Sequence, residues 1–268
     1  MSRTAIITGA SGSMGAAAAE SLASEGWRVI MACRNLEKAE RIRSGIVSRH
    51  PSAEIEAVHL DLSSLSSVRK FAETMKDESI DVLFNNAGTI CREWSMTEDG
   101  YERTFQVNFV GPALLSLLLS DKLERIVSMV SLTCSLTGIA PGYSGDSKDG
   151  FSQLGTYARS KLSLFLFTLE LGRRKGLDVK LSDPGIVNSN MITMGRWFDP
   201  LADILFRPFC SSPEKGVSPA LNAIRTDGMG PGYYKGRKNL PVKKRFFSHP
   251  AASGLYGMIE VLADGTRK

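Results

Sequence analysis

The stretch TGASGSMG, from Thr8 to Gly15, follows the short apolar run AIIT and precedes an alanine-rich segment that is typical of a helix. A strand, a glycine-rich turn and a helix in this order can bind a diphosphate, because free backbone N–H groups and the helix dipole both point at the anion. Such a turn can also simply join a strand to a helix, so the stretch alone leaves both interpretations open. It fits TGxxGxxG, with Gly9, Gly12 and Gly15, or TGxxxGxG, with Ser13 in place of the middle glycine.

Strand and helix patterns alternate from this turn to about residue 185. Short apolar or alternating runs predict strands at residues 5–8, 27–33, 54–62, 80–88, 124–131 and 177–185. Amphipathic segments predict helices at about residues 13–25, 36–50, 63–78, 98–119 and 156–175. This alternation predicts an α/β fold with a doubly wound, Rossmann-type parallel sheet in a three-layer α/β/α arrangement. We find no repeat and no linker, so residues 1–268 are expected to form a single domain.

Composition excludes several classes of protein. A hydrophobic content of 43% suits a globular chain, and the longest apolar run, residues 162–169, is far short of the ~20 residues of a membrane span. We therefore expect no integral membrane segment. The cysteines have no paired spacing and no export signal precedes them, which favours a reducing, cytoplasmic location; they are Cys33, Cys91, Cys134 and Cys210. The three histidines are scattered, so no metal site is expected.

Positive charge is concentrated near the C-terminus. Residues 227–268 hold eight Lys or Arg and three Asp or Glu, and so carry the whole net charge of +5. A basic segment can contact nucleic acid or an anionic membrane. No basic helical face with interleaved aromatic residues is present, so we interpret it as a solvated surface and expect no nucleic-acid partner.

The end of the second predicted strand indicates the cofactor. A fold that binds NAD usually places an acidic residue here for the ribose 2′-hydroxyl. This chain has Cys33 followed by Arg34. A guanidinium suits a 2′-phosphate, which a carboxylate would repel. The sequence therefore predicts NADP(H), with NAD(H) as the weaker alternative.

A second motif lies in the predicted helix at 156–175. Tyr157 and Lys161 are four residues apart and so share one helix face. A free tyrosine has a pKa near 10, too high for efficient proton transfer at neutral pH, and a neighbouring ammonium lowers it. The YxxxK pattern is common by chance, so it indicates a catalytic pair only in the context of other motifs in the chain.

That context is the order of motifs along the chain: TGASGSMG, ACRN, HLDL, NNAG, VNFVG, RIVSMVSL, YARSK and DPGIV. In this order, over nearly the whole chain, they resemble the short-chain dehydrogenase/reductase family. SKLSLFLFTLEL and GYYKGRKNLP are most similar to its retinol dehydrogenase-like and protochlorophyllide reductase-like branch. The resemblance implies an NAD(P)-binding domain that interconverts carbonyls and alcohols by hydride transfer.

The resemblance assigns four catalytic roles. Tyr157 would exchange a proton with the substrate oxygen, and Lys161 would bind the nicotinamide ribose and lower the pKa of Tyr157. Ser131 would polarise the carbonyl, and Asn108 would support a water that links Lys161 to solvent. Ser135 is the alternative to Ser131. The separation of 26 positions from Ser131 to Tyr157 indicates a loop inserted at the mouth of the site.

The same resemblance assigns the cofactor contacts. The length of 268 residues and the NNAG motif favour TGxxxGxG, which makes Ser13 a departure from the usual glycine. Its hydroxyl would cap the following helix or donate to a phosphate oxygen. The expected cofactor-binding residues are Gly9, Ser11, Ser13, Met14, Gly15, Arg34, Asp61, Leu62, Asn86, Ala87, Gly88, Tyr157, Lys161, Pro184, Gly185 and Val187.

A segment rich in large apolar residues follows, at about residues 186–212, and is expected to form a lid over the substrate. It indicates a sizeable apolar substrate that is retinoid-like, steroid-like or long-chain. Two alternatives stay open: reduction of a C=C bond in a porphyrin-like substrate, and a non-catalytic NADP(H)-binding regulatory module. A homodimer or homotetramer is left open as the assembly.

Overall fold

An eight-stranded sheet with the order β3-β2-β1-β4-β5-β6-β7-β8 forms the centre of the molecule. The structure is a computed structural model and describes residues 2–185 and 212–265. The first six strands are parallel, and all five residues of the first are buried. The strands are β1 (Thr4–Thr8), β2 (Arg28–Cys33), β3 (Ile55–His59), β4 (Ile80–Asn85), β5 (Leu123–Met129), β6 (Asp178–Asp183), β7 (Gly232–Lys235) and β8 (Lys238–Leu240).

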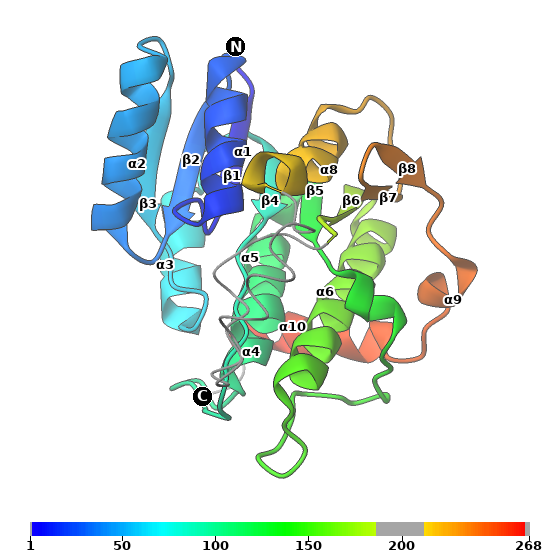
Figure 1. The fold of residues 1–268 in the computed structure, drawn as a ribbon. Coiled ribbons are helices and arrows are strands. Elements are labelled where there is room, and N and C mark those ends of the chain that lie inside the picture. Colours follow the sequence, from blue (N-terminus) through cyan, green and yellow to red (C-terminus); the bar gives the residue numbers. More distant parts are fainter. Residues whose placement is uncertain (1, 186–211, 266–268) are drawn as a thin grey trace, which may run out of the picture.

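Helices cover both faces of this sheet (Figure 1). One face packs against α3, α5, α6 and α10, and the other against α1, α2 and α8, each around its own apolar core. The helices are α1 (Ser13–Ser24), α2 (Leu36–Arg49), α3 (Leu65–Thr74), α4 (Arg103–Phe105), α5 (Gly111–Leu119), α6 (Gln153–Lys175), α8 (Pro213–Arg225), α9 (Lys244–Phe247) and α10 (Ala252–Ala263). The predicted three-layer, doubly wound fold is thus confirmed.

The sheet departs from the prediction at its last strand. β7 pairs in parallel with β6, but β8 returns antiparallel to β7, so the GYYKGRKNLP segment forms a hairpin. Gly236 closes its turn with a φ of +57°, a conformation that favours glycine. The hairpin places Lys235 and its neighbours at the carboxyl end of β6.

The single helix predicted at about 98–119 begins later than expected and is not α-helical throughout. The helix starts only at Arg103, because the Glu102 side chain accepts from the N–H groups of residues 104 and 105. A π-helical turn, η1 (Gln106–Val110), then separates α4 from α5. Pro112 has no N–H to donate to the carbonyl four residues earlier, at Asn108, which favours the wider turn at this point.

A buried ionic cluster joins the strands at the amino edge of the sheet. Asp178, with a side chain only 2% exposed, pairs with Arg125 and with Lys180, and also accepts from the N–H of Gly230. Arg125 donates further to the carbonyls of Ala223, Ile224 and Thr226 at the end of α8. This one carboxylate therefore connects β5, β6 and the segment that leads to β7.

The substitution Asp178→Asn should destabilise the fold strongly, because it leaves the buried Lys180 and the partly buried Arg125 without their counter-charge. Breaking a buried pair in this way typically costs about 3–5 kcal/mol. The midpoint of urea unfolding should fall clearly for Asp178→Asn and stay near the wild-type value for the control Glu124→Gln, whose side chain is exposed. Equal midpoints for the two variants would rule out a structural role for the cluster.

Candidate functional site

The glycine-rich turn depends on two of its three glycines. Gly9 has a φ of +65°, and a Cβ there would lie 3.0 Å from the backbone of Ala87. A Cβ on Gly15 would lie only 2.5 Å from the carbonyl oxygen of Gly9. Gly12 has an ordinary φ of −82° and is the N-cap of α1. The two ways of reading the motif thus share the glycines that the backbone requires, and differ only at positions 12 and 13.

Thr8 ties the end of β1 to the segment after β4. Its hydroxyl accepts from the N–H groups of Asn86 and Ala87, at 3.0 Å each, and donates to the carbonyl of Phe84. The Asn86 amide donates back to the carbonyl of Thr8 at 2.9 Å. The TG and NNAG motifs therefore form one interlocked structure at the carboxyl edge of the sheet.

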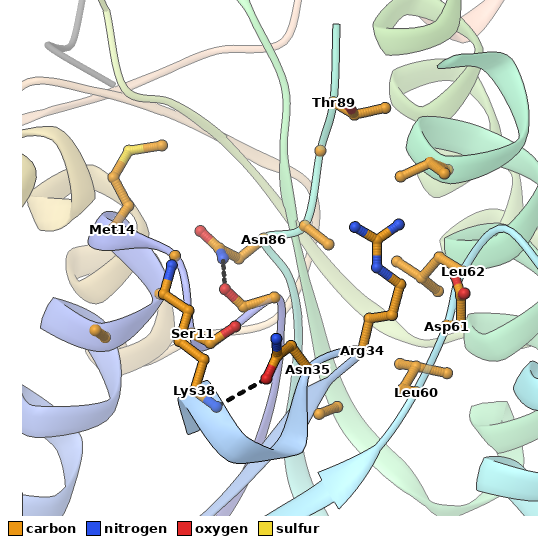
Figure 2. Close-up of a pocket in the computed structure, with 18 of the residues that line it drawn as sticks. Ser11, Met14, Arg34, Asn35, Lys38, Leu60, Asp61, Leu62, Asn86 and Thr89 are labelled. Atoms are coloured by element: carbon orange, nitrogen blue, oxygen red, sulfur yellow. Dashed lines mark hydrogen bonds between the residues drawn. The ribbon is translucent and has the colours of Figure 1, made fainter. Parts of the chain in front are cut away.

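A cleft of about 830 Å³ lies between these two motifs and the end of β2. Most of the predicted cofactor-binding residues line it: Gly9, Ser11, Ser13, Met14, Gly15, Arg34, Asp61, Leu62, Asn86, Ala87 and Gly88. Figure 2 shows Arg34 extending between Asn86 and Leu62, and Lys38 extending toward the turn at Ser11. Both cations therefore face the cleft.

The cleft fits an anionic dinucleotide in three respects. The N-terminus of α1 has no side-chain cap, so its N–H groups are left for another acceptor. The buried carboxamide oxygen of Asn86 has no hydrogen-bond partner among the described residues. The last residue of β2 is Cys33, which is buried, and the cleft-lining residues at positions 34–42 include the cations Arg34 and Lys38 and no acid.

Ser13 is the exposed first residue of α1 and also lines the cleft. The expected cap does not form, because Gly12 occupies the N-cap position and no side chain caps the helix. The side chain of Ser13 therefore lies at the N-terminus of α1 and makes no capping hydrogen bond there.

Tyr157 and Ser131 come together at the carboxyl end of β5. Ser131 follows this strand and caps the short helix η3 (Leu132–Ser135), where its hydroxyl accepts from the Thr133 hydroxyl at 3.0 Å. Burial raises the pKa of Tyr157 to about 12, and a hydrogen bond with Ser131 lowers it. The other two serines differ: Ser135 is exposed, and Ser128 is buried against Thr168. This arrangement favours Ser131 as the site hydroxyl.

Lys161 lies one turn further along α6 and is 2% exposed. Its ammonium donates to the carbonyl of Met129, the last residue of β5, at 2.9 Å. Burial lowers the pKa of Lys161 to about 8. A Cβ on Gly88 would lie 3.3 Å from this ammonium and 3.4 Å from the side-chain oxygen of Asn108, so the lysine reaches the end of the cofactor cleft.

Asn108 lies in the π-helical turn and is fully buried. Its side chain accepts from the N–H of Thr89 at 2.7 Å and donates to the carbonyl of Thr89 at 2.9 Å. It also donates to the hydroxyl of Ser160, the residue before Lys161, at 3.0 Å. Asn108 thereby joins the NNAG segment to the catalytic helix.

A hydrogen bond with Ser131 lowers the pKa of Tyr157 in the structure, and the expected effect of the Lys161 ammonium on that pKa stays a prediction. Burial, Cys134 and Asp183 act in the opposite direction. The side chains of Tyr157 and Lys161 are both desolvated, and desolvation favours the neutral form of each.

The predicted insertion before Tyr157 is a loop held by Asp146. This carboxylate accepts from Nε and Nη2 of Arg159, at 2.9 and 2.6 Å, from the hydroxyl of Thr156, and from the hydroxyl of Tyr143 at 3.0 Å. The backbone carbonyl of Asp146 accepts from the Trp94 indole at 3.0 Å. The loop is therefore fixed to the first turn of α6, on both sides of Tyr157.

At the end of β6, Asp183 is 1% exposed and organises the DPG turn. It accepts from the N–H of Gly185 at 2.9 Å and from the hydroxyl of Tyr233 at 2.8 Å, and pairs with Lys235 at 3.3 Å. The turn residues Pro184 and Gly185 lie beside this network. Val187 and the lid predicted at 186–212 lie outside the described residues, apart from Ser212, the N-cap of α8.

Sequence reasoning missed four residues of the site: Lys38, Thr89, Ser160 and Asp183. Lys38 is an exposed residue in the first turn of α2, and this turn borders the cleft. Its position four residues after Arg34 was the sequence feature that could have predicted this. An acid in the DPG motif was the signal for Asp183. Thr89 acts mainly through its backbone, which no residue pattern reveals.

The part of the chain that the structure describes contains neither a membrane-spanning helix nor a cluster of metal ligands. None of the helices there is long and apolar enough to cross a membrane. Within the same residues, no group of three or more His, Cys, Asp or Glu could hold a metal ion.

Comparisons with known proteins agree with this geometry. Residues 3–196 match the family of short chain dehydrogenases. The chain is 34% identical to WW domain-containing oxidoreductase of Pongo abelii over 87% of its own length, but it spans only 61% of that relative. It is 31% identical to retinol dehydrogenase 12 of Homo sapiens over 96% of its length and 84% of that protein.

Solved structures show the same fold. The crystal structure of an uncharacterized protein from Mycobacterium Paratuberculosis has a TM-score of 0.77 and 30% identity, with 98% of this chain and 93% of that chain covered. A protein from Beutenbergia cavernae, described as an NAD(P) dependent gluconate 5-dehydrogenase with bound NADP, has a TM-score of 0.65 and 25% identity, covering 82% and 88%. With the match over residues 3–196, these likenesses identify the chain as a member of the short-chain dehydrogenase/reductase family.

Proposed function

We propose that the protein is an NADP(H)-dependent oxidoreductase that interconverts a carbonyl and an alcohol on a sizeable apolar substrate. The observation that carries the proposal is that Tyr157 and Ser131 meet beyond the carboxyl end of β5, where Lys161 also binds, while Lys161 and Asn108 lie beside Gly88 of the cleft. A hydroxyl, a phenol and an ammonium at one place can bind and protonate an oxygen on which negative charge develops.

The nicotinamide cofactor supplies the hydride when it is bound. The chain's own residues handle the oxygen and the proton. Tyr157 donates its phenolic proton to the oxygen in reduction and accepts it in oxidation. Ser131 orients that oxygen and, by its hydrogen bond, stabilises the phenolate of Tyr157. Lys161 holds the cofactor ribose, and Asn108 fixes the end of α6 that carries both side chains.

The preference for NADP(H) is supported by charge in the cleft. Arg34 and Lys38 both face it, and the end of β2 has no acid to bind a ribose hydroxyl. The relative from Beutenbergia cavernae has bound NADP. Gly9 and Gly15 shape the turn itself, because a Cβ on either residue would lie too close to neighbouring protein atoms.

An apolar substrate is supported by exposed apolar side chains around Tyr157 and Ser131. Leu132 is 46% exposed, Leu136 80% and Leu154 52%, all within five residues of one of the two. Retinol dehydrogenases among the relatives agree with such a substrate. A cytoplasmic location and a homodimeric or homotetrameric assembly stay predictions of the sequence.

The substitution Tyr157→Phe should reduce turnover about 100- to 10,000-fold, the usual contribution of a positioned general acid. NADPH binding, followed by fluorescence, should be nearly unchanged because the cleft is intact. NADPH oxidation would be measured with a panel of apolar ketones, aldehydes and quinones. Tyr256→Phe, which keeps the ring stacked on Phe167, is the control. Retained turnover in Tyr157→Phe would refute the mechanism.

The substitution Arg34→Asp should weaken NADPH binding by about tenfold or more, since a charge-assisted bond worth ~1.5–3 kcal/mol is lost and repulsion is added. NADH binding should be little affected or improved. Steady-state kinetics with both cofactors would measure the preference. Arg41→Asp makes the same charge change on the exposed outer part of α2 and serves as the control. An unchanged preference in Arg34→Asp would contradict the NADP(H) assignment.

Substitutions at Ser13 test where the phosphates lie. Ser13→Gly should leave NADPH binding similar or tighter, because it removes a Cβ at the N-terminus of α1. Ser13→Val should weaken binding, because the branched side chain crowds the same space. Titration calorimetry would compare the two. Indifference to both changes would place the phosphates elsewhere in the cleft.

A further inference from the structure

The hairpin β7–β8, the helix α9 and the segment between them are rich in basic residues; we call residues 235–247 the basic edge. Six of the eleven residues from 235 to 245 are Lys or Arg, and no Asp or Glu occurs between Asp227 and Glu260. The cations are Lys235, Arg237, Lys238, Lys243, Lys244 and Arg245. Figure 1 places these elements at the end of the sheet opposite β3 and α2.

Many cations elsewhere among the described residues are paired with carboxylates. Arg28 pairs with Glu78 and Glu56, Arg49 with Glu20, and Arg225 with Glu25. On the basic edge, the side chains of residues 237, 238, 243 and 244 are exposed, and none of the four has an ion pair with another described residue. The basic edge therefore presents uncompensated positive charge to solvent.

Apolar side chains are interleaved with these cations. Phe247 is 49% exposed and Leu240 36% exposed, and Val242 between them is half-buried. Beneath them, Phe246 packs against Phe165 of α6, with ring centroids 4.4 Å apart, and so anchors α9 on the body of the protein. The basic edge thus carries both positive charge and protruding apolar groups, and Phe246 anchors its helix on the protein.

Protection of an edge strand does not account for this composition. Lysine on an exposed edge commonly prevents pairing with another sheet. β8 supplies only Lys238 for that purpose, whereas residues 243–245 and 237 lie outside the strand. The three cations on or next to α9 therefore need another explanation.

We propose that the basic edge docks the protein on the surface of an anionic phospholipid bilayer. Clustered Lys and Arg are attracted to anionic headgroups, and aromatic or aliphatic side chains among them enter the boundary with the acyl chains. The combination of unpaired cations with Phe247 and Leu240 matches a lipid surface in both charge and polarity. A nucleic acid would match the charge but leave these apolar side chains in water.

The position of the basic edge relative to the site adds a consequence. β7 runs parallel to β6, and Lys235 pairs with Asp183 at the carboxyl end of that strand, so the hairpin turn lies at the edge of the sheet that carries the site. Docking through this turn would bring the carboxyl edge of the sheet, and with it the candidate site, close to the membrane. The docking itself does not depend on the proposed activity.

Flotation of the full-length protein with vesicles tests the proposal. The protein should bind vesicles of phosphatidylcholine mixed with phosphatidylserine and not vesicles of phosphatidylcholine alone. High NaCl should release it, because exposed charges are screened over about 10 Å at 0.1 M salt. Inorganic phosphate at the same ionic strength as the NaCl should release it no further, which distinguishes a lipid surface from a site for free phosphate.

A charge-reversal variant and a matched control complete the experiment. Arg237→Glu, Lys238→Glu and Lys244→Glu together should lower the bound fraction at least tenfold. Lys70→Glu, Lys76→Glu and Lys122→Glu make the same change in net charge away from the basic edge and should bind as wild type. Phe247→Ser alone should lower binding several-fold at low salt, and it serves as the test if the triple variant does not fold.

Three results would overturn the proposal: no preference for anionic vesicles, equal loss of binding in the two triple variants, or binding to single-stranded RNA in place of vesicles. NADPH binding by the basic-edge variants should be unchanged. A failure of vesicle binding with intact turnover would leave the proposed oxidoreductase activity unaffected, so the two claims fail separately.

Discussion

The buried ammonium of Lys161 is the constraint around which the site is built. A lysine that is 2% exposed loses most of its hydration, and among the described residues its ammonium has one hydrogen bond, to the carbonyl of Met129. Such a group is tolerated only where the surrounding backbone is held in place. Three segments hold it: the end of β5, the glycine at position 88 and the π-helical turn with Asn108. A buried cation at this point is costly for folding, which indicates that it serves the cleft beside it.

Much of the fold and half of the site could be predicted from residues alone. The alternation of strands and helices predicts the sheet because each pattern reflects local burial. Tyr157 and Lys161 are predictable together because four residues make one turn of helix. The contacts of Asn108 are not, because they need the backbone of Thr89 and a π turn that depends on Pro112. Interactions with backbone groups leave no mark in the residue pattern.

Electrostatic roles were the hardest to predict. The YxxxK spacing favours a lysine that lowers the pKa of Tyr157, but spacing says nothing of desolvation, which raises that pKa to about 12. In the sequence, Lys38 cannot be distinguished from any solvated lysine at the start of a helix. Only the folded structure shows that it lines the cleft. Asp183 likewise depends on Tyr233 and Lys235, which come from a hairpin fifty residues later. Each case depends on tertiary contacts.

The central claim is that Tyr157 exchanges the proton and that Ser131 helps to set its pKa. The most direct measurement is the pH dependence of alcohol oxidation at saturating NADP+, which requires the phenolate. The rate should rise with pH in the wild type, and this rise should move to higher pH in Ser131→Ala, because the hydrogen bond that lowers the pKa of Tyr157 is lost. In Tyr157→Phe the rise should disappear. A rise that persists at the same pH in Tyr157→Phe would show that another group is the base.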